Sequence, residues 1–146
     1  MIKYLIVKNK KIKNATASEY NNIKFKSKLE LTVYKTLVQA GFNPEYENKH
    51  YTLWEGFKPI IPFFTKDKNK KLKLNNTKLK DITYTPDFTF MYKDKLIIIE
   101  AKGKENDVYP IKKKLFRKIL EGTNALFFEI FTKNQLLQAI DIIKKL

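Results

Sequence analysis

Cysteine is absent from the sequence, and histidine occurs once, as His50. Without thiols the chain forms neither disulfides nor thiolate metal sites, a composition that suits an intracellular setting. A single histidine argues against zinc hydrolase sites and against Ser-His-Asp catalysis. Any chemistry is therefore left to carboxylates. We expect His50 and the lone Trp54 to be packing or surface residues.

Long hydrophobic runs are also missing. Every apolar run is far shorter than the roughly 18 residues that a membrane span needs. The apolar stretch near the N-terminus is too short for a signal-peptide core and is followed by lysines. We therefore expect a cytoplasmic protein with no membrane partner.

Acidic residues are half as numerous as basic ones, with 15 Asp+Glu against 30 Lys+Arg and a formal net charge of +15. This excess predicts a polyanionic partner, with nucleic acid first and an anionic membrane surface a distant second. The chain is 43% hydrophobic, as a folded protein is, and 146 residues fit one domain. Within this single domain, 1–146, we expect a basic N-terminal arm over 1–26 and a lysine-rich loop or hairpin over 66–80. The arm could contact phosphates or a second subunit, and a partly ordered terminus fits equally well.

Two β-rich segments stand at the centre of the chain, residues 84–90 (YTPDFTF) and 96–103 (LIIIEAKG). The short polar segment between them can form a tight hairpin turn. Because residues two apart on a strand share a face, Glu100 and Lys102 point the same way. Hairpin pairing can bring Asp87 near Glu100. The pattern therefore predicts two carboxylates and a lysine converging at the end of a buried sheet.

Such a cluster has a metal-site interpretation and a structural one. Buried carboxylates without partners would cost several kcal/mol each. A hard divalent cation with oxygen ligands would remove that cost, and Mg²⁺ is the usual choice for phosphoryl chemistry. The alternative is a strand that ends in a surface ion pair, worth about 0–1 kcal/mol. The order and spacing on one hairpin favour the metal site.

A helix is predicted over 27–40, with Ser27 as N-cap, Gly41 as stop and an apolar stripe formed by Leu29, Val33, Leu37 and Ala40. Glu30 has two interpretations. It can be the capping-box partner of Ser27, or it can face the carboxylate site. The sequence leaves the two nearly even.

A second helix follows the carboxylate strand, with Pro110 in its first turn. We expect its buried stripe to be Ile111, Leu115 and Ile119. Its other positions carry five cations that are well placed to hold a DNA or RNA backbone: Lys112, Lys113, Lys114, Arg117 and Lys118. From the lysine-rich segment we add, against the alternative of a solvated face, the phosphate contacts Lys70, Lys71 and Lys73. Tyr109 and Asp107 are candidate supporting groups.

The last helix is predicted to start at Thr132 and to bury Leu136, Leu137, Ile140 and Ile143. The element order is then α-β-β-β-α-β-α. It predicts an α/β fold in which helices flank a central mixed β-sheet.

This order, together with Pro86-Asp87, Glu100-x-Lys102 and the upstream Glu30, resembles the PD-(D/E)xK nuclease superfamily. Within it, the pattern is similar to the phage Holliday junction resolvases of the endonuclease I type, where Ser-x-x-Glu precedes Tyr-Thr-Pro-Asp-Phe and Glu-x-Lys-Gly. The resemblance covers about residues 23–121, and segment 66–80 departs from it. It implies a restriction-endonuclease-like fold and a homodimer that cuts branched duplex DNA, in the host cytoplasm if the chain is phage-encoded.

The resemblance also implies residue roles. Asp87 and Glu100 would ligate Mg²⁺ or Mn²⁺, with the carbonyl of Ala101 as a further ligand. Glu30 would complete the site directly or through water, which favours its functional interpretation. Lys102 would position or deprotonate the attacking water and stabilise charge in the transition state.

The expected function is therefore a Mg²⁺-dependent endodeoxyribonuclease that acts on branched DNA. Another nuclease of the superfamily remains open: a transposon end-cleaving, restriction-like or nicking and repair enzyme. A non-catalytic basic module that binds nucleic acid, with carboxylates that only form ion pairs, is the alternative from a different class.

Overall fold

The computed structural model describes residues 16–146, and its centre is a four-stranded mixed sheet. Strands β8 (Phe88–Tyr92) and β9 (Lys95–Ala101) form an antiparallel hairpin with Tyr92 opposite Lys95. Strand β10 (Leu126–Ile130) runs parallel to β9, and β3 (Glu45–Tyr46) runs antiparallel to β8 at the opposite edge. The predicted hairpin is thus confirmed.

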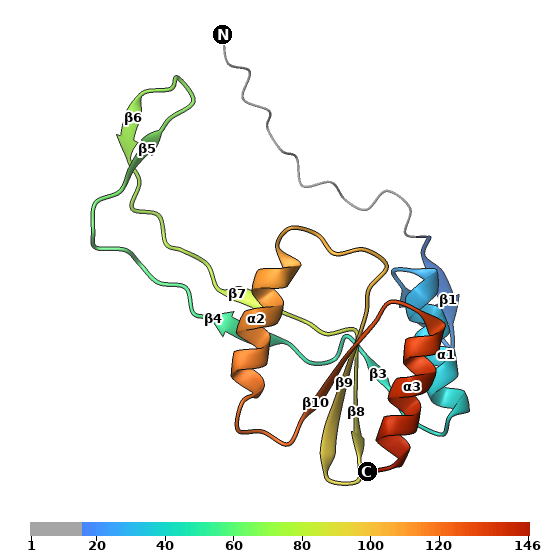
Figure 1. The fold of residues 1–146 in the computed structure, drawn as a ribbon. Coiled ribbons are helices and arrows are strands. Elements are labelled where there is room, and N and C mark those ends of the chain that lie inside the picture. The colour runs from blue at the N-terminus through green and yellow to red at the C-terminus, as the bar shows by residue number, and fades with distance from the viewer. Residues whose placement is uncertain (1–15) are drawn as a thin grey trace.

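Helices cover both faces of this sheet (Figure 1). Helices α1 (Lys28–Gln39) and α3 (Lys133–Lys144) pack on one face against Ile97 and Ile99. Helix α2 (Tyr109–Leu120) packs on the other face against Ile98. Strand β9 is apolar from Leu96 to Ile99 because it is covered on both sides. The α/β class with a central mixed sheet between helices agrees with the prediction.

The helix ends follow the predicted capping signals. The Glu30 N–H donates to Oγ of Ser27 at 3.1 Å, so Ser27 caps α1. Thr132 and Gln135 form a complete capping box on α3. These side chains satisfy N–H groups that the first helical turn leaves without partners.

The buried stripe of α2 differs from the prediction. Ile111 is 62% exposed and Ile119 is also exposed, whereas Tyr109 and Phe116 are buried. Both rings pack against Tyr84, with centroid distances of 6.4 and 4.7 Å. The large aromatic side chains therefore set the rotation of the helix, which turns the isoleucines outward. On α3, Leu137 is likewise exposed and Ala139 joins the core in its place.

The start of the described chain is a small hairpin of β1 (Ser18–Tyr20) and β2 (Ile23–Phe25). Phe25 is buried in the core between Tyr34, Tyr46 and Phe88. Residues 18–25 of the expected N-terminal arm are thus part of the folded body, and residues 1–15 lie outside the described range.

A long excursion leaves the body between β4 (Tyr51–Trp54) and β7 (Ile82–Tyr84), which pair with each other (Figure 1). It ends in a two-stranded ribbon of β5 (Phe64–Lys66) and β6 (Leu72–Leu74). We call residues 57–80 the arm. The predicted lysine-rich segment, 66–80, contains β6 and the last residue of β5.

None of the helices within residues 16–146 combines the length and apolar character that a membrane crossing requires.

Candidate functional site

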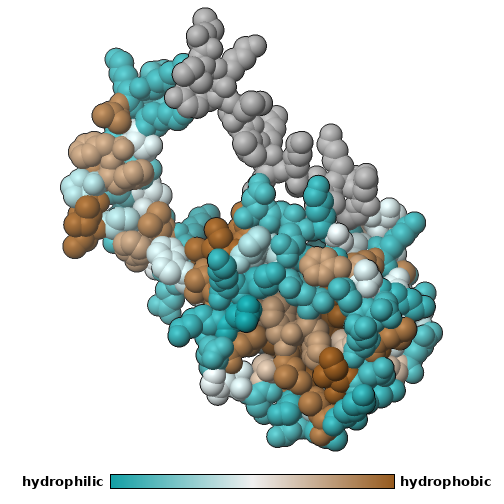
Figure 2. Space-filling view, viewed as in Figure 1, coloured by the Kyte–Doolittle hydropathy of each residue, from teal (hydrophilic) through white to brown (hydrophobic). Residues whose placement is uncertain are grey.

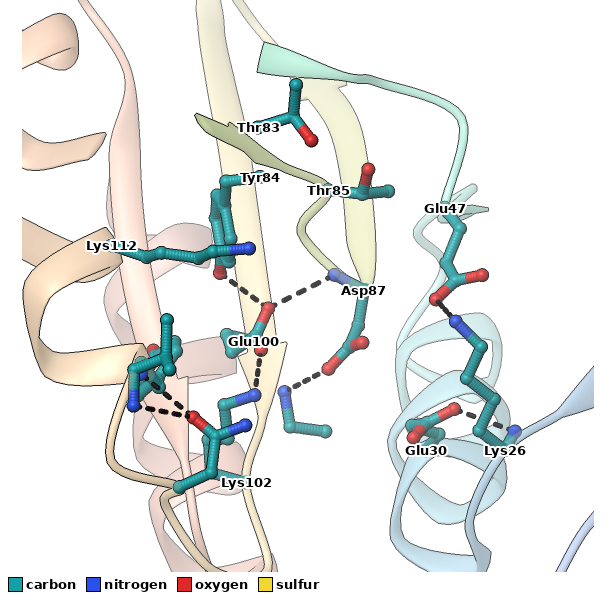
Figure 3. A pocket seen from close by; sticks show the side chains of 14 residues that line it. Lys26, Glu30, Glu47, Thr83, Tyr84, Thr85, Asp87, Glu100, Lys102 and Lys112 are labelled. Carbon is teal, nitrogen blue, oxygen red and sulfur yellow. Dashed lines mark hydrogen bonds and ion pairs between the residues drawn. The ribbon is translucent and has the colours of Figure 1, made fainter. Parts of the chain in front are cut away.

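A cleft of about 580 Å³ opens beyond the C-terminal end of β9, between α1 on one side and α2 on the other (Figure 3). Strand β7 and the segment from Tyr84 to Asp87 contribute to its wall. The fold brings all five residues predicted for the metal and catalytic site to this cleft: Glu30, Asp87, Glu100, Ala101 and Lys102.

Asp87 and Glu100 form the floor of the cleft and are only 9% and 2% exposed. Each carboxylate accepts a hydrogen bond from the backbone beside the other. Glu100 Oε2 accepts from the Asp87 N–H at 3.3 Å, and Asp87 Oδ2 accepts from the Ala101 N–H at 2.7 Å. The Tyr84 hydroxyl also donates to Glu100 Oε2 at 2.6 Å. The two carboxylates are therefore held side by side.

Burial gives this pair an unusual protonation. Desolvation, reinforced by the neighbouring Glu100 charge, raises the pKa of Asp87 from 3.8 to about 8, although the Ala101 N–H and Lys102 oppose the shift. Burial and the Glu100 carboxylate likewise raise the pKa of Tyr84. Near neutral pH the pair retains a proton that an exposed aspartate would have lost. A bound cation would favour the fully ionised form.

Lys102 lies directly over the carboxylate pair. Its Nζ is 2.5 Å from Glu100 Oε1 and 4.2 Å from the centre of the Tyr109 ring. The predicted shared face of Glu100 and Lys102 is thus confirmed. The ammonium is held between a carboxylate and an aromatic face.

Tyr109 is fixed by contacts of its own. Its hydroxyl donates to Glu129 Oε2 on β10 at 2.7 Å, and its backbone N–H donates to Asn106 Oδ1 at 2.8 Å. Burial, together with the Glu129 hydrogen bond, raises the pKa of Tyr109. The residue therefore supports Lys102, as expected. Asp107 is exposed and does not line the cleft, whereas the neighbouring Asn106 lines it and accepts from the Val108 and Tyr109 N–H groups.

Glu30 takes part in the helix start and also lines the cleft, but the predicted capping box is not completed, because its carboxylate accepts from the Lys26 N–H and not from the Ser27 N–H. Its backbone N–H belongs to the helix cap, while its carboxylate is buried on the α1 side of the cleft (Figure 3). There the carboxylate accepts from the Tyr46 hydroxyl at 2.6 Å, the Lys26 N–H at 2.9 Å and the Ser27 hydroxyl at 2.9 Å. In the part of the chain that the structure describes, no group of three or more acidic, histidine or cysteine side chains is placed to hold a metal ion. Glu30 thus lines the same cleft as the carboxylate pair without joining it in a preformed ligand cluster.

A hard divalent cation nevertheless fits the donor set. Asp87 and Glu100 offer only carboxylate oxygens, and burial, followed by the charge of Glu100, raises the pKa of Asp87. Together they could hold Mg²⁺ or Mn²⁺, with Glu30 reached directly or through water. The Ala101 N–H donates to Asp87 Oδ2, and the role of the Ala101 carbonyl as a metal ligand stays a prediction.

The structure divides the predicted phosphate-binding cations among four settings. Lys112 lines the cleft. Lys113 does not point freely outward, because it pairs with Glu129 at 3.0 Å and Glu105 at 3.2 Å. On the exposed side of α2 lie Lys114, Arg117 and Lys118. The arm, whose β5–β6 ribbon lies away from the helices and the central sheet (Figure 1), carries the other three: Lys70, Lys71 and Lys73.

The cleft also contains residues that the sequence analysis did not select. Lys26 lies near the cleft entrance in an ion pair with Glu47, and both residues line the cleft. Tyr46 and Tyr84 hold the carboxylates of Glu30 and Glu100. Of these residues only Tyr84 had a usable signal, because it opens the Tyr-Thr-Pro-Asp segment.

The chain belongs to the family described as "Protein of unknown function (DUF1064)", whose model matches residues 9–135. The matched range contains every cleft residue named above and the entire arm. No curated protein and no solved structure matches the chain.

Proposed function

We propose that this protein is a divalent-metal-dependent endodeoxyribonuclease of the PD-(D/E)xK type with a restriction-endonuclease-like fold. The observation that carries the proposal is the buried Asp87–Glu100 pair with the Lys102 ammonium 2.5 Å from it. An ion pair with a purely structural role rarely contains two buried carboxylates and one lysine, because the charge of the second carboxylate has no cation to offset its desolvation cost. In the proposed metal-assisted cleavage of a phosphodiester, the two carboxylates would hold the cation and the lysine would act beside it.

The residues divide the chemistry among themselves. Asp87 and Glu100 hold the cation, which, when bound, polarises the phosphate and lowers the pKa of water. Lys102 places a positive charge beside these carboxylates, where it can orient the attacking water and stabilise the charge that develops on the phosphate. Tyr109 keeps this ammonium in place through its ring. Lys112 lines the cleft and attracts the DNA backbone, while Lys26 lines the cleft in its ion pair with Glu47.

The proposed substrate is branched duplex DNA, cut by a homodimer that acts on two strands. The net charge of +15 and the exposed cations of α2 support a polyanionic duplex. Phosphate contacts of this kind respond to the shape of the backbone and carry no base sequence.

The test compares cleavage of an immobile four-way junction with cleavage of a plain duplex of the same sequences, in Mg²⁺, Mn²⁺ and EDTA. The variants are Glu100→Gln and Lys102→Ala, with exposed controls Glu121→Gln and Lys133→Ala. We expect metal-dependent paired incisions near the branch, lost in both cleft variants and kept in both controls, while DNA binding persists in all. Equal cutting of both substrates would refute the preference for junctions and leave the nuclease assignment intact. Binding without cutting in either metal would refute the nuclease and leave a basic binding module.

A further inference from the structure

The arm is anchored to the body at a defined base. The Gly56 N–H donates to Asp81 Oδ1 at 2.7 Å, and the Leu79 N–H donates to the Phe57 carbonyl at 2.9 Å. The two chains cross so closely that a Cβ at Gly56 would lie 2.1 Å from the Leu79 carbonyl oxygen. The arm therefore leaves the body as two paired segments of the same chain, and this pairing fixes the direction in which it leaves.

The tip of the arm is a preformed ribbon with a specific turn. Phe64 pairs with Leu74, and Lys66 pairs with Leu72. Asp67 Oδ1 accepts from the backbone N–H groups of Asn69 and Lys71 at 2.8 and 2.9 Å, which closes the turn. Asp67 is the only acidic residue of the arm, so its carboxylate serves the turn.

The lysines of the arm have no such partner. Within residues 16–146 no ion pair involves any of the eight, and all are exposed: Lys58, Lys66, Lys68, Lys70, Lys71, Lys73, Lys78 and Lys80. Eight lysines and one aspartate give the arm a net charge of about +7 at neutral pH. A charge of this size on so thin an element would repel itself unless a polyanion neutralised it.

The arm also exposes large apolar side chains (Figure 2). Ile60 and Ile61 are 91% and 76% exposed. Phe64, Leu72 and Leu74 gather on one face of the ribbon, because residues directly opposite each other on paired strands share a face. A two-stranded ribbon by itself has marginal stability in water, and an apolar face of this kind marks a binding surface.

We propose that the arm binds duplex DNA outside the cleft, with its lysines on phosphates and its apolar side chains in a groove. This inference rests on the proposed function for the identity of the nucleic acid. Charge selects the occupant, because a second copy of a +15 chain would repel an arm of about +7, whereas duplex DNA carries one negative charge per about 1.7 Å. The major groove admits a two-stranded ribbon, and apolar side chains contact thymine methyls or wedge between base steps.

The length of the arm sets how far this contact lies from the cleft. An extended segment from Phe57 to Phe64 spans at most about 25 Å at roughly 3.3 Å per residue, and the ribbon adds about 10 Å. The arm can therefore reach about 35 Å, or roughly ten base pairs. Duplex extended by that length beyond the cleft should bind more tightly than duplex that fills the cleft alone.

The experiment measures affinity per site by fluorescence anisotropy in EDTA, with duplexes of about 10 and about 30 base pairs. The charge variant is Lys70→Gln/Lys71→Gln/Lys73→Gln, and the apolar variant is Ile60→Ser/Ile61→Ser. Two controls complete the set: a matched charge control on and after α3, Lys133→Gln/Lys144→Gln/Lys145→Gln, and the cleft variant Glu100→Gln. All substitutions are at exposed positions except Glu100→Gln.

For wild type we expect a gain of about tenfold from the longer duplex. The charge variant should lose the gain and reduce the slope of log affinity against log salt by about 2–3, at 0.9 per phosphate. The apolar variant should lose most of the gain with its salt slope kept, and both controls should keep the gain. Equal per-site affinities in wild type and both arm variants would overturn the proposal. So would sedimentation that shows the arm variants losing a wild-type dimer while duplex binding stays unchanged.

The two proposals fail separately. If the arm-dependent gain is present but neither junction nor duplex is cut, only the nuclease assignment falls. If cleavage is present and the gain is absent, only the role of the arm falls.

Discussion

Replacement of Asp87 by asparagine should stabilise the metal-free protein at mildly alkaline pH. The pKa of Asp87 rises from 3.8 to about 8 on folding, chiefly through desolvation. Between these values the folded state binds more protons than the unfolded state, so the free energy of unfolding falls as pH rises from about 4 to about 8. A shift of about four units, at 1.36 kcal/mol each, sets an upper limit of roughly 6 kcal/mol for this loss. Asparagine carries no charge, and its side-chain oxygen can still accept from the Ala101 N–H.

The assay is urea denaturation in EDTA at about pH 5 and about pH 8, for wild type, Asp87→Asn and the exposed control Asp141→Asn. Between the two pH values we expect wild type and control to lose at least about 2 kcal/mol more than Asp87→Asn. Mg²⁺ at about 100 times its Kd should restore about 2.7 kcal/mol to wild type at pH 8 and much less to Asp87→Asn. An Asp87→Asn protein that is less stable than wild type at pH 8 in EDTA, or that has the same pH slope, would refute the electrostatic argument.

Three further substitutions test separate parts of the molecule. Tyr109→Phe keeps the ring beside Lys102 and should lower the single-turnover cleavage rate less than tenfold. Tyr109→Ala removes the ring and should lower the rate by about a hundredfold. If both variants lowered it by about a hundredfold, the hydroxyl and not the ring would be the group that matters. Lys112→Gln should reduce the salt slope of DNA binding, measured by anisotropy, by about 0.9, and an unchanged slope would exclude a phosphate contact. Phe116→Ala should cost about 3–5 kcal/mol in urea denaturation, because this ring is buried between α2 and the sheet; a cost below about 1 kcal/mol would contradict the packing described.

The sequence predicted the features that depend on neighbours in the chain. The β8–β9 hairpin, the shared face of Glu100 and Lys102, and the caps Ser27 and Thr132 all follow from spacings of two to four residues. The rotation of α2 could not be predicted in this way. Its apolar residues allow more than one stripe, and the choice is made by aromatic packing against Tyr84, which comes from a distant strand.

The parts of the site that the sequence did not predict depend on contacts across the fold. Tyr46 binds the carboxylate of Glu30 from sixteen residues away along the chain, and Lys113 and Glu129 are likewise sixteen residues apart. A count of charges treats Lys113 as a free cation because the partner lies on β10. Only the fold shows that the Lys113 ammonium is neutralised by an ion pair, whereas Lys112, one residue earlier, lines the cleft.

Glu30 shows why a structural and a functional interpretation of one residue need not compete. The helix cap uses the backbone N–H of Glu30, while its carboxylate lines the cleft and also accepts from the hydroxyl of the capping Ser27. The cap fixes the first turn of α1, and that turn fixes where the carboxylate lies. Because the Ala101 and Asp87 N–H groups fix Asp87 just before β8 and Glu100 near the end of β9, the position of Glu30 across the cleft is set by the packing of α1 on the sheet. A cation bound by the carboxylate pair would reach Glu30 directly or through a water molecule, and the core that joins α1 to β8 and β9 fixes where Glu30 lies relative to that cation.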